Sequence, residues 1–398
     1  MKSLILAAGR GKNLFPLTET RPKPMIPLCG KPILDYIIEG LIETGNRDII
    51  MVVGHQSEKI RNYYKNGEEL GVSIQYIEKK EHKGIGNAIL STEDKFVPGE
   101  HFFLVYADIL FESNIFSDTL ATYNSKLAPV ASITLTPKIH PYYGNVSIDQ
   151  SIGITKIVNQ LEEAQGGSYV LAGVFIFDYT LFKTLKESGR SMHKSFGPLV
   201  EKERLFGSIF EHEWIDLGYP WNVLDANRLK MKSFKKANID GTVQMEGNCS
   251  VIGPAVIEKN VTLSSGSVIK GPCYIGEGTY IGNNVLVRPN TSIGANCIIG
   301  YGVELKNCVL FDSVKVGRLS CVADSVVGEN VDLGTGIITV NHTQEDEIIN
   351  LKINDKIIKS GLTKLGSFIG DQAKVGARNT LAPGTIISAR QTIPHNIS

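Results

Sequence analysis

Apolar residues follow two different periods along the chain. Up to about residue 230, short apolar runs typical of strands alternate with stretches whose apolar residues have helical spacing. The expected strands are Leu4–Ala8, Ile49–Val53, Ile74–Ile77, Phe102–Tyr106 and Val174–Phe177, and the expected helices are Ile33–Thr44 and Glu58–Lys65. This alternation predicts an α/β domain with a Rossmann-like mixed, mostly parallel sheet covered by helices. Ligands of such sheets bind at the carboxyl ends of the strands.

In the second half, aliphatic residues recur every six positions. The rows are Val251, Ile257, Leu263, Ile269, Ile275, Ile281, Val287, Ile293, Ile299 and Leu305, and then Ile369, Val375, Leu381 and Ile387. Glycine often follows the aliphatic residue, as in Ile275-Gly276. One short strand per hexad and a tight turn after it predict a parallel β-helix built from hexapeptide repeats. Residues 341–360 are polar and break the period, so we expect a protruding loop there.

The length of 398 residues favours two domains, and the two periods indicate where they meet. We predict a first domain over residues 1–228, a basic, turn-prone linker over 229–240 and the β-helix domain over 241–398.

The composition restricts the partners and the compartment. Forty-one Lys and Arg residues balance forty-one Asp and Glu residues, so no overall charge favours nucleic acid or an anionic membrane. The N-terminal apolar run is too short for a signal peptide or a membrane span, and we therefore expect a cytoplasmic protein. The six cysteines form no CxxC pair and have no histidine at metal spacing, so buried free thiols are favoured over a zinc site or disulfides.

A glycine-rich turn follows the first expected strand. Its glycines would let backbone N–H groups approach an anion, and basic residues in and after the turn would add positive charge. A plain strand-to-helix turn of an α/β protein is the alternative. On the phosphate-binding hypothesis, the candidate contacts are Ala7, Ala8, Gly9, Arg10, Gly11 and Lys12, with further positive charge from Arg21 and Lys23.

Three linked blocks in this region resemble the opening of the sugar-1-phosphate nucleotidylyltransferases. They are Gly9-x-Gly11 followed by Leu14-x-Pro16-Leu17-Thr18, then Arg21-Pro22-Lys23-Pro24-Met25, and then Gly30-Lys31-Pro32-Ile33-Leu34. Tyr106-Ala107-Asp108 and Trp214-Ile215-Asp216-Leu217-Gly218 are similar to two further blocks of the family. The nearest likeness is to archaeal two-domain enzymes that join a UDP-sugar pyrophosphorylase to a glucosamine-1-phosphate acetyltransferase. The resemblance covers nearly the whole chain and implies that the β-helix is left-handed.

The resemblance implies a reaction between a nucleoside triphosphate, UTP or dTTP, and a sugar 1-phosphate, either glucose 1-phosphate or N-acetylglucosamine 1-phosphate. A sugar-phosphate oxygen attacks the α-phosphorus in line and pyrophosphate leaves, so catalysis consists of positioning and charge neutralisation. Asp108 and Asp216 would hold Mg²⁺, and Lys23 would bind a phosphate. Strand-end aspartates and a solvated lysine are the alternatives. Further implied substrate contacts are Gly84, Tyr143, Gly144 and Gly173.

The first half departs from the family pattern in three places. Asn13 stands where relatives carry an arginine that clamps the triphosphate, and asparagine has no charge to replace it. Glu78 or Lys79 falls where relatives carry a base-pairing glutamine, and Asn159-Gln160 replaces a Glu-Lys pair.

The β-helix also departs from its relatives. Arg318 occupies the place of the histidine that removes a proton during attack on acetyl-CoA, and arginine cannot act as a base near neutral pH. Asn341 and Lys364 match residues near the acyl site of the relatives. Because the histidine is replaced, acetyl-CoA is nevertheless a doubtful second ligand.

Two hypotheses from different classes follow. The first is a working nucleotidylyltransferase whose β-helix serves oligomerisation, as a homotrimer or a larger homo-oligomer. The second is a catalytically impaired paralogue that acts as a nucleotide-sugar sensor or as a structural subunit.

Overall fold

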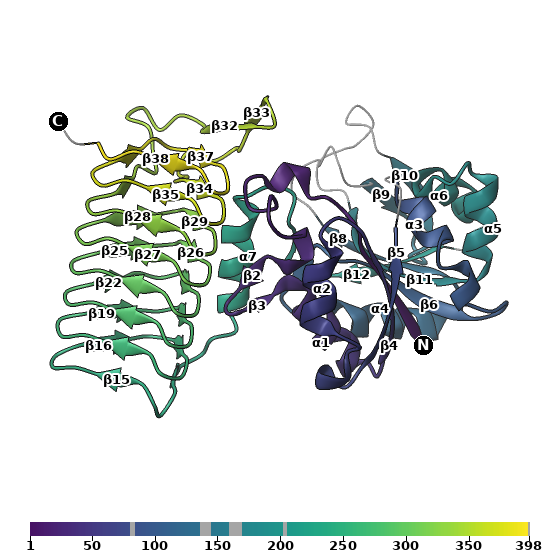
Figure 1. Cartoon of the computed structure of the whole chain (residues 1–398). Helices are drawn as coiled ribbons and strands as arrows, with labels where there is room; N and C mark the ends of the chain where they lie inside the picture. The colour runs from purple at the N-terminus through teal and green to yellow at the C-terminus, as the bar shows by residue number, and fades with distance from the viewer. Residues whose placement is uncertain (80–83, 136–144, 159–168, 202–204, 397–398) are drawn as a thin grey trace. The chain divides into compact units, whose positions relative to one another are not determined.

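The computed structural model describes residues 1–79, 84–135, 145–158, 169–201 and 205–396. The chain divides into two compact units, which are described separately (Figure 1). Unit 1 comprises Met1–Arg10, Pro22–Met25 and Ile33–Trp214, and unit 2 comprises Gly11–Arg21, Ile26–Pro32 and Ile215–Ser398. Two short segments from the N-terminal region therefore belong to the unit that contains the β-helix.

Unit 1 is built on a mixed nine-stranded sheet, as predicted. Its main path runs β10-β9-β11-β6-β1-β4-β5, and β8 and β12 extend it beside β11. The four strands β6, β1, β4 and β5 are parallel, whereas β11 runs antiparallel to β6. The strand bounds are β1 (Lys2–Ala7), β4 (Asp48–Val53), β5 (Ser73–Glu78), β6 (His101–Tyr106), β8 (Val130–Leu135), β9 (Asn145–Ile148), β10 (Ile154–Val158), β11 (Tyr169–Asp178) and β12 (Phe206–Phe210).

Helices cover both faces of this sheet, which explains its continuous apolar strands. On one face, Leu4, Phe102 and Phe175 pack in a cluster with side chains of α3, α5 and α6. On the other face, Phe103 meets Phe116 of α4 edge to face. The helices of the unit are α1 (Ile33–Glu43), α2 (Ser57–Tyr64), α3 (Gly84–Leu90), α4 (Ile115–Lys126), α5 (Thr180–Glu187) and α6 (Met192–Glu201), with short 3-10 helices η2 (Lys23–Met25), η3 (Glu68–Leu70) and η4 (Glu93–Lys95).

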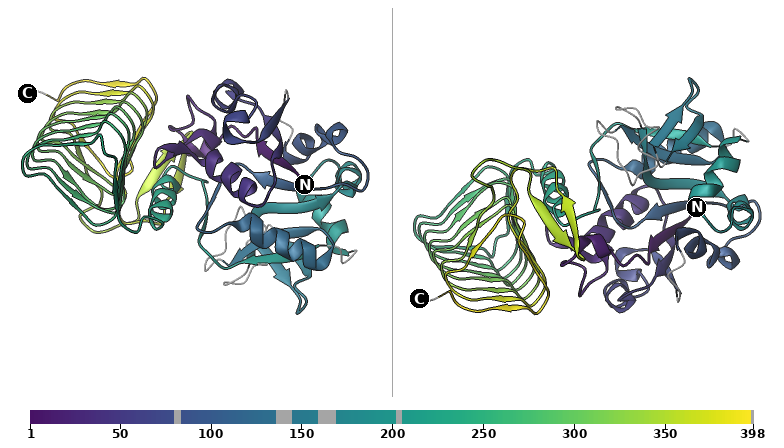
Figure 2. Two further views of the ribbon diagram at one scale, coloured as in Figure 1. Left: turned by 90° about the horizontal axis from the view of Figure 1, so that it is seen from below. Right: turned by 90° about the horizontal axis from the view of Figure 1, so that it is seen from above.

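Unit 2 contains a left-handed parallel β-helix whose three parallel sheets form the sides of a prism (Figure 2). The first sheet comprises β14 (Ala237–Ile239), β17 (Ala255–Ile257), β20 (Cys273–Ile275), β23 (Thr291–Ile293), β26 (Val309–Leu310), β29 (Val326–Val327), β34 (Phe368–Ile369) and β37 (Ile386–Ile387). The second comprises β15 (Gln244–Met245), β18 (Thr262–Leu263), β21 (Tyr280–Ile281), β24 (Ile298–Ile299), β27 (Lys315–Val316), β30 (Asp332–Leu333), β35 (Lys374–Val375) and β38 (Thr392–Ile393). The third comprises β16 (Ser250–Ile252), β19 (Val268–Lys270), β22 (Leu286–Val287), β25 (Glu304–Lys306), β28 (Cys321–Ala323), β31 (Ile338–Thr339) and β36 (Thr380–Leu381).

The six-residue period places one aliphatic side chain per strand inside the prism. Ile269, Ile281 and Ile293 are fully buried in a single cluster that runs through the β-helix. Glycine after the aliphatic residue is a packing requirement, because a Cβ on Gly276 would lie 2.6 Å from the backbone nitrogen of Ala295 in the next coil. The interior row does not stop at Leu305: it continues through Leu310 after a step of five residues.

The segment that breaks the hexad period forms a β-hairpin rather than an irregular loop. Strand β32 (Asn350–Ile353) pairs antiparallel with β33 (Lys356–Lys359). Asn354 and Asp355 make the two-residue turn with positive φ values of 47° and 62°, which these residue types tolerate.

The remaining elements of unit 2 lie at the start of the chain and before the β-helix. They are η1 (Lys12–Leu14), the two-stranded β2 (Pro27–Leu28) and β3 (Lys31–Pro32), and helix α7 (Asn222–Met231). Residues 229–240, expected as a linker, contain the end of α7 and strand β14, which pairs with β17.

The cysteines fit the prediction of free thiols. All six are unpaired, and Cys273, Cys297 and Cys308 are buried. Burial raises the pKa of each of these three thiols to about 12, so they stay protonated and unreactive near neutral pH. None of the helices in the described ranges is both long and apolar enough to cross a membrane.

Because the aliphatic row is buried, a substitution inside the prism should destabilise the β-helix more than a substitution on its outer surface. Ile269→Ala removes a fully buried side chain and is expected to lower the free energy of unfolding by about 2–5 kcal/mol. Ile252→Ala, on the neighbouring strand at 55% exposure, is the control and should cost less than about 1 kcal/mol. Urea unfolding followed by far-UV circular dichroism gives both values, and equal losses would contradict the assigned interior row.

Candidate active site

Parallel pairing of β1 with β6 brings two candidate segments to one edge of the sheet. Leu6 pairs with Tyr106 near the carboxyl ends of these strands. The residues that follow, Ala7 to Gly9 on one strand and Ala107-Asp108 on the other, therefore leave the sheet side by side. Ala7 and Ala8 are buried, whereas Gly9 and Arg10 are exposed.

An ion pair marks this edge. The Lys23 Nζ atom, in η2, lies 2.6 Å from Oδ2 of Asp108, so two predicted catalytic residues are in direct contact. Their side chains are 14% and 31% exposed, respectively. Partial burial strengthens the attraction between the ammonium and the carboxylate relative to a pair in bulk water. The structure thus assembles one cationic group suited to a phosphate and one carboxylate suited to a hard metal ion.

Gly173, predicted to contact the sugar, lies beside the same strand end. Its φ of +81° falls where the pairing of β11 with β8 shifts register, between Leu171 and Phe175. A Cβ at this position would lie 3.3 Å from Tyr106 Cβ, so glycine is needed both for the turn and for the close approach. The neighbouring Ala172 carbonyl accepts a hydrogen bond from the indole Nε1 of Trp214 at 2.9 Å.

The tyrosine at this edge remains a neutral phenol. Burial, with a smaller contribution from the Asp108 carboxylate, raises the pKa of Tyr106 well above its usual range. Its hydroxyl is therefore protonated at neutral pH and can only supply an uncharged contact.

The residues of the glycine-rich turn fall in both units, up to Arg10 in unit 1 and from Gly11 in unit 2. Gly54, after β4, packs closely on Ala8, since an added Cβ would lie 3.0 Å from the Ala8 carbonyl oxygen. Gly11 adopts a left-handed conformation with φ 61°, and Lys12 and Asn13 are exposed. Arg21, expected to add free positive charge, is instead buried in an ion pair with Asp371 at 2.6 Å.

The second predicted metal ligand belongs to unit 2. Asp216 ends strand β13 (Trp214–Asp216), and its carbonyl accepts the Gly218 N–H at 2.9 Å. Its partnership with Asp108 on one ion stays a prediction. No cluster of three or more His, Cys, Asp or Glu side chains able to hold a metal occurs in the described part of the chain. The chemistry of Asp108 nevertheless fits Mg²⁺, which proteins often bind through one or two carboxylates together with substrate phosphates.

The other predicted contacts in the first half are less informative. Gly84 begins α3 with φ +80°, and its carbonyl accepts a hydrogen bond from Lys79 Nζ at 2.9 Å. Tyr143 and Gly144, and the Asn159-Gln160 pair, lie outside the described residues.

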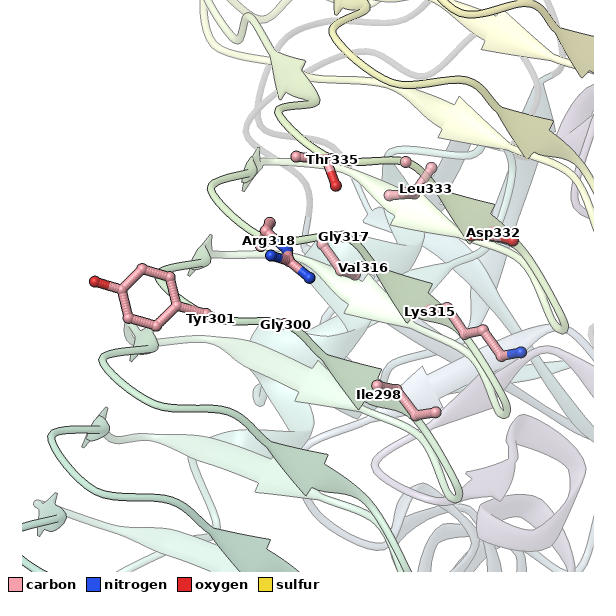
Figure 3. A pocket seen from close by; sticks show the side chains of 11 residues that line it. Ile298, Gly300, Tyr301, Lys315, Val316, Gly317, Arg318, Asp332, Leu333 and Thr335 are labelled. Carbon is pink, nitrogen blue, oxygen red and sulfur yellow. The ribbon is translucent and has the colours of Figure 1, made fainter.

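The predicted acyl-site residues of the β-helix have local structural partners. The Asn341 side-chain amide donates to buried Asp324 at 2.5 Å. The backbone carbonyl of Asn341 accepts the N–H of Leu365, which follows exposed Lys364. Arg318 lines an open depression of ≈ 520 Å³ on the second sheet, together with Tyr301 and Lys315 (Figure 3). No histidine is among the residues that line this depression.

Two residues with a structural role at the N-terminal segments could not be identified from the sequence. Asp371 and Glu329 both contact Arg21, at 2.6 and 2.8 Å. Each follows a glycine in a β-helix turn, where acidic residues are common, so only their position in the fold distinguishes them.

The fold is that of a nucleotidyltransferase. The family model described as nucleotidyl transferase matches residues 2–233, and the model described as GMPPB C-terminal domain matches residues 269–398. The chain therefore belongs to the nucleotidyl transferase family.

Full-length relatives share both halves. The chain is 36% identical to the bifunctional protein GlmU of Methanococcus maripaludis over 100% of this chain and 94% of the relative. It is 33% identical to a bifunctional sugar-1-phosphate nucleotidylyltransferase/acetyltransferase of Sulfurisphaera tokodaii over 98% and 94%. A solved structure of a Bacillus anthracis protein described as a glucose-1-phosphate thymidylyltransferase aligns with a TM-score of 0.53 at 23% identity. It covers 60% of this chain and 98% of that protein, and this likeness concerns the fold.

Substitution of Gly9 tests whether the glycine-rich turn binds a nucleotide. No described atom lies within 4 Å of a Cβ built on Gly9, and its φ is not positive, so Gly9→Ala should change the free energy of unfolding by less than about 1 kcal/mol. If a phosphate contacts this backbone, the methyl group should weaken nucleoside triphosphate binding roughly tenfold or more.

The control for this prediction is Gly197→Ala in α6, which also has no described atom within 4 Å and no positive φ. Titration calorimetry with each triphosphate measures the affinities. Equal affinities of the two variants would remove Gly9 from the binding site.

Proposed function

We propose that this nucleotidyltransferase transfers a nucleotidyl group from UTP or dTTP to glucose 1-phosphate or N-acetylglucosamine 1-phosphate in an Mg²⁺-dependent reaction that releases pyrophosphate. The observation that carries this proposal is the Lys23–Asp108 ion pair at the edge where β1 and β6 end. The names of the two bifunctional relatives support the same reaction class.

The two side chains have the charges that the proposed reaction requires. Lys23 Nζ and Asp108 Oδ2 lie 2.6 Å apart at the strand-end edge. Lys23 would bind a phosphate oxygen and Asp108 would hold the Mg²⁺ ion, so that each charged group has a partner of opposite charge.

The chain's own residues contribute position and charge rather than a covalent nucleophile. Backbone groups of Ala8 and Gly9 contact the triphosphate, and exposed Lys12 faces its negative charge. Lys23 stabilises the charge that develops on the phosphate during in-line attack. The backbone at Gly173 lines the sugar side of the site, since glycine leaves room there.

Asp108 and Asp216 are the residues that would hold Mg²⁺. When bound, the ion neutralises phosphate oxygens and favours departure of pyrophosphate. Asp108 suits this role because its carboxylate is a hard oxygen ligand that is only partly buried.

The β-helix serves assembly in this proposal, and acetyl transfer is not part of it. Arg318 cannot take a proton from an amine near neutral pH, and the Asn341 amide is engaged by Asp324. Three large apolar side chains on and beside the second sheet, Tyr280, Ile298 and Tyr301, are 41%, 47% and 52% exposed. Such a patch is typical of a face that packs on another protein.

Asp108→Asn is expected to lower the rate of pyrophosphate release by at least about a hundredfold, because the amide is a poor metal ligand and loses its charge. The assay combines the purified protein, Mg²⁺, each nucleoside triphosphate and a panel of sugar 1-phosphates. Asp48→Asn, an exposed aspartate at the opposite end of the parallel strands, is the control and should leave the rate within about twofold.

Two outcomes would contradict the proposal. An unchanged rate in Asp108→Asn would remove that carboxylate from the mechanism. Nucleotide binding without any pyrophosphate release by the unaltered protein would favour the alternative of a sensor or structural subunit.

The exposed apolar patch supports association of the β-helix with copies of itself, and the family resemblance implies that three copies assemble. Sedimentation equilibrium at micromolar concentration should give about three times the chain mass of 43.5 kDa, or a multiple of it. A monomer under these conditions would contradict an assembly role for the β-helix.

A further inference from the structure

The segment from Gly11 to Arg21, called the anchor segment below, is held by the β-helix within unit 2. The Glu19 carboxylate accepts the Ala389 N–H at 2.6 Å. The Asn354 amide, at the turn of the β32–β33 hairpin, donates to the Lys12 carbonyl at 2.7 Å. Both ends of the segment thus have polar contacts with β-helix residues more than 300 positions away.

Arg21 makes the most buried of these contacts. Its Nη2 atom lies 2.6 Å from Asp371 Oδ2 and 2.8 Å from Glu329 Oε2. Arg21 is 7% exposed and Asp371 is 2% exposed. The guanidinium carbon lies 4.8 Å from the centre of the Phe311 ring, so an aromatic face covers one side of the cation.

Contacts within the β-helix turns orient the Asp371 carboxylate toward Arg21. Asp371 Oδ1 accepts the Glu329 N–H at 2.8 Å, which fixes the carboxylate while its other oxygen faces Arg21 and the Thr20 hydroxyl. The turn residue Gly328 leaves the required space, because a Cβ there would lie 2.5 Å from Asp371 Oδ1. These contacts within the β-helix therefore fix the orientation of the Asp371 carboxylate independently of Arg21.

Removing the Arg21 guanidinium would leave the buried Asp371 carboxylate without its cation, and this favours a well-defined arrangement of the pair. Water cannot easily replace the lost partner at this degree of burial. The end of the anchor segment is consequently one of its most restrained points.

The chain connects this point directly to the candidate active site. Arg21 is followed by Pro22, whose ring fixes one backbone dihedral, and then by Lys23, which pairs with Asp108. At its other end, the segment begins at Gly11, two residues after Gly9. A displacement of the segment would therefore move both the phosphate-binding turn and the lysine.

We infer that Asp371 and Glu329 are positioning residues for nucleotidyl transfer: they hold Arg21, and through it the backbone that carries Lys23 and the end of the glycine-rich turn. This inference rests on the proposed function. It gives the β-helix a part in the transfer reaction that is separate from assembly.

The test compares Asp371→Asn with Glu304→Gln in the full-length protein. Glu304 is also a β-helix carboxylate paired with an arginine, Arg288, at 2.8 Å, but both side chains are about 40% exposed. Asp371→Asn is expected to lower kcat/KM roughly ten- to hundredfold, mainly through a higher KM for the nucleoside triphosphate. Glu304→Gln should stay within about twofold of the unaltered protein.

A second readout does not depend on activity. Hydrogen–deuterium exchange of peptides covering residues 11–25 should become at least about fivefold faster in Asp371→Asn and stay unchanged in Glu304→Gln. If the unaltered protein releases no pyrophosphate, the proposed function fails, and the exchange measurement still decides whether Asp371 holds the segment.

Arg21 variants separate positioning from folding of the β-helix. Arg21→Met alters only the anchor segment and should reproduce both effects even if Asp371→Asn does not fold, whereas Arg21→Lys should restore part of kcat/KM by keeping the charge. Unchanged exchange and unchanged KM in Arg21→Met, or equal behaviour of Asp371→Asn and Glu304→Gln, would overturn the inference.

Discussion

The parallel pairing of β1 with β6 is the constraint on which the candidate active site depends. Because both strands run in the same direction, their carboxyl ends leave the sheet together, and the glycine-rich turn and Asp108 follow these ends directly. Lys23 meets Asp108 at 2.6 Å, and Gly173 leaves the space beside Tyr106 open. The carboxylate proposed for the metal thus directly follows a strand of the sheet, and the cation proposed for the phosphate reaches it from the short helix η2.

The β-helix adds a second constraint on the same short stretch of sequence. The aliphatic row inside the prism fixes the coils, and the coils in turn fix carboxylates at their turns, among them Asp371. Residues 11–21 belong to this unit, and residues 22–25 return to the unit of the sheet. The stretch that joins the turn and the lysine is therefore divided between the two units, and its first part is held by polar contacts with the β-helix.

Most of the fold could be predicted because each half repeats a simple physical requirement. Ile281, Val287 and Ile293 recur every six positions because each short strand must bury one aliphatic residue. The strand Phe102–Tyr106 is apolar because both faces of its sheet are covered. The motifs single out Asp108 and Lys23, and the structure places these two side chains in contact, while their roles stay predictions. The contacts of Arg21 could not be predicted, because a buried arginine and a phosphate-binding arginine look alike in sequence, and its partner Asp371 lies 350 positions away. The six-residue period does not identify the interior row beyond Leu305, because the steps from Leu305 to Leu310 and from Val322 to Val327 are each one residue shorter.

We expect Asp108 to bind the metal ion that neutralises the nucleotide phosphates. A crystal of the protein grown with Mn²⁺ and a nucleoside triphosphate, measured at the manganese absorption edge, locates this ion. We expect an anomalous peak within coordination distance of both the Asp108 carboxylate and a phosphate oxygen. A nucleotide bound at this edge, with the manganese peak elsewhere and Asp108 still paired with Lys23, would contradict it.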